Sequence, residues 1–120
     1  MIAETEARAA DRAVAGEFAR RVAERLGAAL SAVYFYGSRA RGTPAPWSDY
    51  DLLVVLKEKD SNAEDAVHEV SMGLLMERGW DLSPKVYGRA RFDAGVRARQ
   101  PFLMGIADEG IQVWSANKKS

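Results

Sequence analysis

The chain has 120 residues, of which 48% are hydrophobic and 28% are charged, a composition that excludes disorder and fits one globular domain. Its 17 lysines and arginines balance its 17 aspartates and glutamates, so it lacks the basic field that non-specific nucleic-acid binding needs. The absence of cysteine excludes a disulfide framework and a thiolate metal site, and no apolar run is long enough to span a membrane. We therefore expect a soluble, cytoplasmic protein.

The first half of the chain predicts one long helix followed by two strands. The helix is expected over residues 1–26, and its apolar side chains recur at i, i+4 spacing: Val14, Phe18, Val22 and Leu26. A strand over 32–36 carries Tyr36 into the core, and a second strand over 50–56 is apolar on both faces after its aspartates, which places it inside a sheet. Between the strands, glycine and two prolines allow only a helical turn over 38–41.

The second half predicts two helices and two strands in alternation. The expected elements are a helix over 61–78, a strand over 80–87, a helix over 97–109 and a strand over 111–114. Ser61 and Glu64 form a capping box at the start of the first of these helices. The buried stripe of that helix is expected at Val67, Val70, Leu74 and Leu75. Pro84 lacks a backbone N–H, so it moves its strand toward a sheet edge or a bulge.

This order of elements predicts an α/β (α+β) fold. Its core would be a small mixed β-sheet with helices packed mainly on one face. The chain contains no repeat, low-complexity segment or linker, so we expect a single domain over residues 1–120, in which residues 116–120 form a loose tail.

The most informative local pattern is a Gly-Ser turn followed, after ten residues, by two aspartates. Gly37 is free to adopt a tight turn, and Ser38 offers hydroxyl and backbone donors to a phosphate. Asp49 and Asp51 project from the same face of a strand, about 6.6 Å apart along the chain. Two such carboxylates repel each other unless cations lie between them. Magnesium prefers carboxylate, phosphate and water oxygens, and two ions can bridge the attacking and leaving oxygens of an in-line displacement.

The residues between these two parts add charge and one aromatic ring. Arg39 and Arg41 add positive charge where the phosphates would lie. Trp47 can stack on a purine base or pack the loop onto the core. Aspartates at the start of a strand are by themselves typical of turns. Their combination with the Gly-Ser turn and the apolar strand favours the chemical interpretation.

The segment from Gly37 to Val54, GSRARGTPAPWSDYDLLV, resembles the signature of the DNA polymerase beta-like nucleotidyltransferase superfamily. It is most similar to the minimal nucleotidyltransferase (MNT) branch in its Gly-Ser, its Ala-Arg-Gly, the ten-residue gap and the Ser-Asp-x-Asp-Leu. The resemblance implies ATP or another nucleoside triphosphate bound by Ser38, and two Mg²⁺ ions held by Asp49 and Asp51. The flanking elements are compatible with this family over nearly the whole chain.

Active members of this family usually carry a third carboxylate on a neighbouring strand, where it serves as base and metal ligand. Asp81, at the start of the third strand, is the candidate here, and Lys85 is expected on the same face. The alternative is that Asp81 caps the preceding helical turn or pairs with a surface arginine. Asp93 is a less suitable substitute, because it is expected beyond that strand in an arginine-rich loop.

A basic stretch follows the third strand, made by Lys85, Arg89, Arg91, Arg97 and Arg99. It can serve as a contact for triphosphate, RNA or an acidic partner, or it can be a solvated face that acidic residues elsewhere balance.

The combined features predict transfer of a nucleoside monophosphate, with AMP from ATP favoured, to an acceptor hydroxyl. The chain is too short for a further substrate-binding domain, so the resemblance implies that a helical HEPN-family partner supplies the acceptor, the pair acting as antitoxin and toxin. Two alternatives stay open. One is a non-catalytic antitoxin that acts by contact, and the other is a small-molecule nucleotidyltransferase of the aminoglycoside-modifying kind that works as a homodimer.

Overall fold

The computed structural model describes residues 2–116, with side chains from residue 8 onward. The elements in chain order are α1 (Ile2–Leu26), a 3₁₀ turn (Gly27–Ala29), β1 (Leu30–Tyr36), α2 (Ser38–Arg41), β2 (Tyr50–Leu56), α3 (Ser61–Arg78), β3 (Leu82–Gly88), α4 (Arg89–Arg97), α5 (Pro101–Glu109) and β4 (Ile111–Ser115). Residues 117–120 of the expected tail lie outside the described residues. Ala116 donates its backbone N–H to the carbonyl of Ser31 at 3.0 Å.

The four strands form one mixed sheet in the order β3-β2-β1-β4. β1 runs antiparallel to both β2 and β4, whereas β2 and β3 are parallel. The predicted mixed sheet is therefore confirmed, with β2 in its interior. β3 is an edge strand, as the missing N–H of Pro84 predicts.

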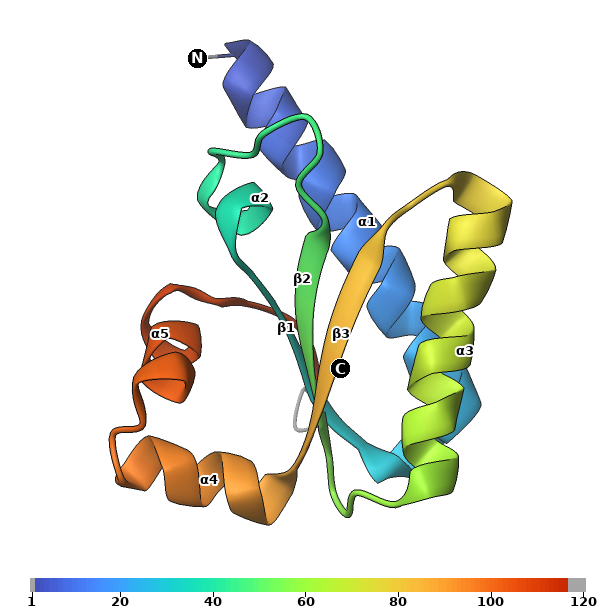
Figure 1. Ribbon diagram of the computed structural model, residues 1–120, viewed down its shortest axis with the longest axis vertical. Coiled ribbons are helices and arrows are strands. Elements are labelled where there is room, and N and C mark those ends of the chain that lie inside the picture. The colour runs from blue at the N-terminus through green and yellow to red at the C-terminus, as the bar shows by residue number, and fades with distance from the viewer. Residues whose placement is uncertain (1, 117–120) are drawn as a thin grey trace.

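Helices cover both faces of this sheet, but unequally (Figure 1). The two long helices α1 and α3 pack together on one face, over the alternate β2 residues Leu52, Val54 and Leu56. The short helices α4 and α5 lie against the other face, where Phe92, Leu103 and Ile106 pack on Leu53 and Val55. The expectation of helices mainly on one face is thus met by the long pair, and the short pair covers part of the second face.

The expected helix over 97–109 is wrong at its start, because the chain breaks there into α4 and α5. Arg99 has a positive φ of 58°, and Pro101 occupies the first turn of α5. Proline has no N–H for a preceding helix and disfavours helical geometry in the residue before it, so a new helix begins at this point.

Two further corrections concern α3. Its N-cap is Asp60 and not Ser61, since the Asp60 side chain accepts from the N–H of Ala63 at 2.8 Å. Leu75 is 39% exposed and so is not in the buried stripe, because it lies one residue, or about 100°, further around the helix than the buried Leu74. Within residues 2–116, none of the helices combines the length and apolar character needed to cross a membrane.

Candidate active site

The Gly-Ser turn closes β1 and leads directly into α2. Gly37 has φ 87° and ψ −167°, a backbone conformation that is essentially restricted to glycine. A Cβ atom at this position would lie 2.2 Å from Oδ2 of Asp51, well inside van der Waals contact. Glycine is therefore required twice here, once for the turn and once to let the aspartate carboxylate pack against the backbone.

The two aspartates lie at the beginning of β2, on the sheet face that carries α4 and α5. Asp51 is paired with Tyr36 of β1, and Asp49 precedes the strand by one residue. Burial raises the pKa of Asp51, and the nearby charge of Asp49 raises it further, while Lys85 and Arg41 act in the opposite direction. The local field therefore disfavours two negative charges in the absence of a cation.

Tyr36 belongs to the same site, although the sequence placed it only in the core. The pKa of its phenol is raised to about 12, first by burial and then by the charges of Asp51 and Asp49. The hydroxyl consequently stays protonated at neutral pH and is available as a donor beside the carboxylates. A tyrosine at the end of a strand carries no signal in a single sequence that distinguishes this role from packing.

Ser38 and Arg39 hold the loop that precedes the aspartates. The Ser38 hydroxyl donates to Oγ of Ser48 at 3.2 Å, and Nε of Arg39 donates to the Ser48 carbonyl at 2.8 Å. The Arg39 guanidinium also lies over the Tyr50 ring at 4.5 Å and donates to Asp11 of α1 at 3.3 Å. Tyr50 completes the group by donating its hydroxyl to Asp11 at 3.4 Å. We call Asp11, Arg39, Ser48 and Tyr50 the loop clamp, because its members hold the residues on both sides of Asp49.

The two arginines of the turn thus have different environments. Arg39 is occupied within the loop clamp, with only 18% of its side chain exposed. Arg41 is exposed, lines a cavity together with Gly37, and its charge lowers the pKa of Asp51. Of the two, Arg41 is the better placed to meet a phosphate. The contribution of Asp11, which comes from α1, could not be found from sequence because it depends on how that helix crosses the turn.

Asp81 lies in the loop before β3 and is exposed. Its backbone carbonyl accepts from the N–H of Tyr50 at 2.9 Å, next to the first paired residues of β2 and β3. In the register of the two strands Ser83 is level with Asp51, and Asp81 lies one residue before the first paired position, Leu82 opposite Tyr50. Among residues 2–116, no three acidic, histidine or cysteine side chains gather as a metal-binding group. The role of Asp81 as third carboxylate stays a prediction.

The structure also shows the surroundings of Asp93, of two arginines in the basic stretch and of Trp47. The expectation that Asp93 lies in a loop is wrong, because residues 89–97 form α4. Asp93 forms an ion pair within this helix with Arg89 at 3.2 Å. In the basic stretch, Arg89 also donates to Oγ of Ser31 at 3.2 Å, and Arg91 lies over the Tyr87 ring at 4.3 Å. Trp47 is 84% exposed, so its alternative role of packing the loop onto the core is not realised.

A divalent cation would offset the repulsion between the two neighbouring carboxylates. Magnesium in proteins commonly takes one or two carboxylates and completes its shell with phosphate oxygens and water. Asp49 and Asp51 supply such a pair at the edge of an exposed turn. The donor set is therefore suited to Mg²⁺ that arrives together with a phosphate-bearing ligand.

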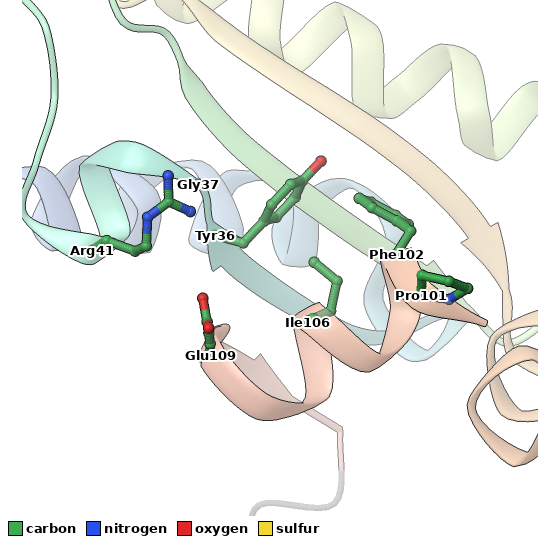
Figure 2. A pocket seen from close by; sticks show the side chains of 8 residues that line it. Tyr36, Gly37, Arg41, Pro101, Phe102, Ile106 and Glu109 are labelled. Atoms are coloured by element: carbon green, nitrogen blue, oxygen red, sulfur yellow. The ribbon is translucent and has the colours of Figure 1, made fainter. Parts of the chain in front are cut away.

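A cavity of about 340 Å³ opens beside the turn. Figure 2 shows that the turn contributes Tyr36, Gly37 and Arg41 to this cavity, and that the facing side of α5 contributes Phe102 and Glu109. The remaining lining residues, Pro101, Gly105 and Ile106, also come from α5. Sequence reasoning missed these residues because the packing of α5 beside the turn, and not a local pattern, brings them to the site.

Residues 16–101 match the model of the nucleotidyltransferase domain family, which is more than half of the chain. The chain belongs to this family, and the resemblance seen in its sequence is confirmed.

Particular relatives agree with that membership. One is a provisionally named protein adenylyltransferase of Methanocaldococcus jannaschii, 31% identical over 94 residues. The match covers 75% of this chain, and the chain spans only 62% of that relative's length.

Solved structures share the fold. A provisionally named nucleotidyltransferase from Sulfolobus solfataricus superposes with a TM-score of 0.63 at 23% identity, over 96% of this chain and 89% of the other. A toxin–antitoxin complex with AMP-PNP contains a chain that superposes with a TM-score of 0.55 at 19% identity, over 85% of this chain and 74% of the other. At these identities the likeness establishes the fold alone.

Proposed function

We propose that this domain transfers a nucleoside monophosphate, AMP from ATP, to a hydroxyl acceptor. The observation that carries the proposal is the contact between the two halves of the motif. The carboxylate of Asp51 lies so close to Gly37 that no side chain fits between them, so the aspartate proposed to bind metal adjoins the turn proposed to bind phosphate. The family to which the chain belongs supports this interpretation.

In this proposal the turn holds the triphosphate. Gly37 and Ser38 offer donors at its backbone and hydroxyl, and Arg41 provides positive charge. Asp49 and Asp51 would hold Mg²⁺, which when bound neutralises charge on the phosphates and orients them. Catalysis then consists mostly of positioning, as expected for phosphoryl-type transfer. Asp81 is the proposed base that accepts the proton of the acceptor hydroxyl.

The acceptor is proposed to be a hydroxyl of a helical partner of the HEPN family, with this chain as the antitoxin. Support comes from the name of the archaeal relative, a protein adenylyltransferase, and from the toxin–antitoxin complex whose chain has the same fold. The cavity beside the turn is too small to serve as a protein-binding surface, so a macromolecular acceptor has to approach from outside it.

A second candidate is an antitoxin that acts by contact, with or without nucleotide. It is favoured by one observation, namely that no third acid joins Asp49 and Asp51 among the described residues. Loss of the third carboxylate would weaken catalysis and leave nucleotide binding in place.

One experiment separates the two candidates. The purified protein is incubated with ATP labelled at the α-phosphate, Mg²⁺ and the product of the adjacent reading frame. We expect label on the partner with the wild type, and none with Asp49→Ala or Asp51→Ala. Asp108→Ala, which removes an exposed carboxylate on α5, is the control and should retain transfer. Tight binding of the partner without any label would contradict the enzyme and support the contact antitoxin.

A further inference from the structure

We propose that the cavity between the Gly-Ser turn and α5 is the nucleoside subsite, so that a base and ribose lie against α5 while the phosphates lie on the turn. This inference rests on the proposed function, because it assigns the remainder of the nucleotide whose phosphates the turn is proposed to hold. The cavity is lined by Gly37 and Arg41 at one end and by Phe102, Ile106 and Glu109 along its side.

The cavity is continuous with the turn. Gly37 and Arg41 belong both to the proposed phosphate cradle and to the cavity wall. A ligand with a phosphate at the turn therefore has its next atoms at the mouth of this cavity. A nucleoside is covalently joined to that phosphate, whereas an acceptor from a partner would have to enter as a separate molecule.

The size and lining of the cavity suit a nucleoside. Small-molecule sites are mostly apolar hollows of about 300–1,000 Å³ with a few placed polar groups, and this cavity has about 340 Å³. Phe102 packs edge-to-face on Tyr36 with 5.5 Å between ring centroids, so the two rings form a fixed aromatic wall. Every nucleobase has a flat face that stacks on such rings.

The cavity carries one positively and one negatively charged side chain. Arg41 reaches the cavity from α2 and Glu109 reaches it from the end of α5 (Figure 2). A guanidinium suits the phosphate end of a nucleotide, and a carboxylate accepts only from N–H or O–H donors. Glu109 is therefore placed to accept from an amino group of the base or a hydroxyl of the ribose, and it disfavours a second phosphate in the cavity.

Gly105 provides a direct test, because it lines the cavity from within α5 and a Cβ built on it meets nothing within 4 Å. Gly105→Leu adds a bulky side chain at the cavity wall and should not disturb the helix, since leucine has a higher helix propensity than glycine. Gly73→Leu is the matched control, because Gly73 lies in α3 with equally open space around its Cβ. Both variants are checked for folding by circular dichroism and thermal unfolding.

Binding of ATP and of inorganic tripolyphosphate is measured by calorimetry with Mg²⁺. We expect Gly105→Leu to bind ATP at least tenfold more weakly than the wild type and to bind tripolyphosphate unchanged, with Gly73→Leu unchanged for both. Normal ATP affinity in Gly105→Leu would overturn the nucleoside subsite and leave the proposed function standing. No ATP binding by the wild type would overturn both.

A second pair of variants does not depend on filling the cavity. Glu109→Ala removes the carboxylate at the cavity, and Asp108→Ala removes its exposed neighbour, which is not among the lining residues. The ratio of ATP affinity to tripolyphosphate affinity cancels the general effect of lost negative charge. We expect this ratio to fall at least threefold in Glu109→Ala and to stay within twofold of the wild type in Asp108→Ala. Equal ratios in the two variants would count against the role of Glu109 in binding the nucleoside.

Discussion

The face of the sheet beneath α1 and α3 and the face beneath α4 and α5 use the same strands, but only the first is filled along its whole length. On the first face Leu52, Val54 and Leu56 of β2 have no exposed surface, and both long helices cover them. On the second face Leu53 and Val55 are equally buried, yet the same row of side chains begins with Asp51, next to an open cavity. Alternation along one strand therefore separates the packed core from the proposed site.

This difference explains how the proposed site can lie at the end of a buried row of side chains. The helices α4 and α5 together cover less of the sheet than the long pair, and they end short of the Gly-Ser turn (Figure 1). Asp51 can then stay partly exposed at the end of its row, while Leu52 beside it is fully buried. The comparison predicts that substitutions on the closed face change stability and that substitutions on the open face change ligand binding.

The largest expected effect is on the closed face. Leu52→Ala removes a fully buried side chain from the core and should lower the free energy of unfolding by about 2–5 kcal/mol. Denaturant titration measures this loss, and Leu75→Ala, which truncates a partly exposed leucine on α3, should stay within about 0.5 kcal/mol of the wild type. Similar losses in both variants would show that the closed face is not packed as described.

The next effect is at the turn. Gly37→Ala places a methyl group against the Asp51 carboxylate and forces alanine into a backbone conformation that costs about 1–3 kcal/mol. We expect ATP affinity in the presence of Mg²⁺ to fall at least about tenfold. The control is Gly79→Ala, because Gly79 has a positive φ of 74° but open space around its Cβ. This variant should lose stability and bind ATP normally. A comparable loss of ATP affinity in Gly79→Ala would show that the close approach of Gly37 and Asp51 does not explain the loss in Gly37→Ala.

A smaller effect is expected from the loop clamp. Lysine cannot reproduce both the planar contact of Arg39 with Tyr50 and its separate hydrogen bonds to Ser48 and Asp11. Because groups that orient metal ligands typically change metal affinity by about 10–100-fold, we expect Arg39→Lys to weaken Mg²⁺ binding by about tenfold in titrations with ATP present. Arg12→Lys, at an exposed position of α1, is the control. Unchanged Mg²⁺ affinity in Arg39→Lys would limit the clamp to a structural role.

The smallest effect concerns the ion pairs on the outside of the closed face. Hydrogen bonds from Arg20 and Arg21 lower the pKa of Glu17 from 4.5 to about 2. Because the folded pKa is depressed, this stabilisation is present above pH 4.5 and is lost as the pH falls toward 2. Glu17→Gln should therefore be less stable than the wild type by about 0.2–1 kcal/mol at pH 7, the range for exposed pairs. Thermal unfolding between pH 7 and pH 2 should show this gap closing, and a gap independent of pH would contradict the assignment.

Much of this arrangement could be predicted from the sequence, because local patterns determine it. The apolar stripe of α1, the turn at 38–41, the β2 strand and the edge position of β3 all follow from side-chain periodicity, glycine and proline. The expected 97–109 helix instead begins at Pro101, which is a local signal for a helix start, after Arg99, whose positive φ no local pattern marks. The helix α4, over 89–97, was not expected at all.

The site was predictable only in part, for a different physical reason. Asp49, Asp51 and Ser38 lie within one short stretch whose spacing alone indicates their use together. Asp11 and Glu109 lie far from that stretch in the chain and reach it through helix packing, which a single sequence does not encode in any readable period. Asp81 depends on the register of two parallel strands, which is set by packing along their whole length.

The central claim is that the open face holds a metal ion and a nucleotide together through Asp49 and Asp51. Its most direct test is the affinity for ATP measured by calorimetry with and without Mg²⁺, for the wild type and for Asp51→Asn, which preserves the shape of the side chain. The account predicts that Mg²⁺ strengthens ATP binding at least about tenfold in the wild type and has almost no effect in the variant. An equal effect of Mg²⁺ on both proteins would contradict it.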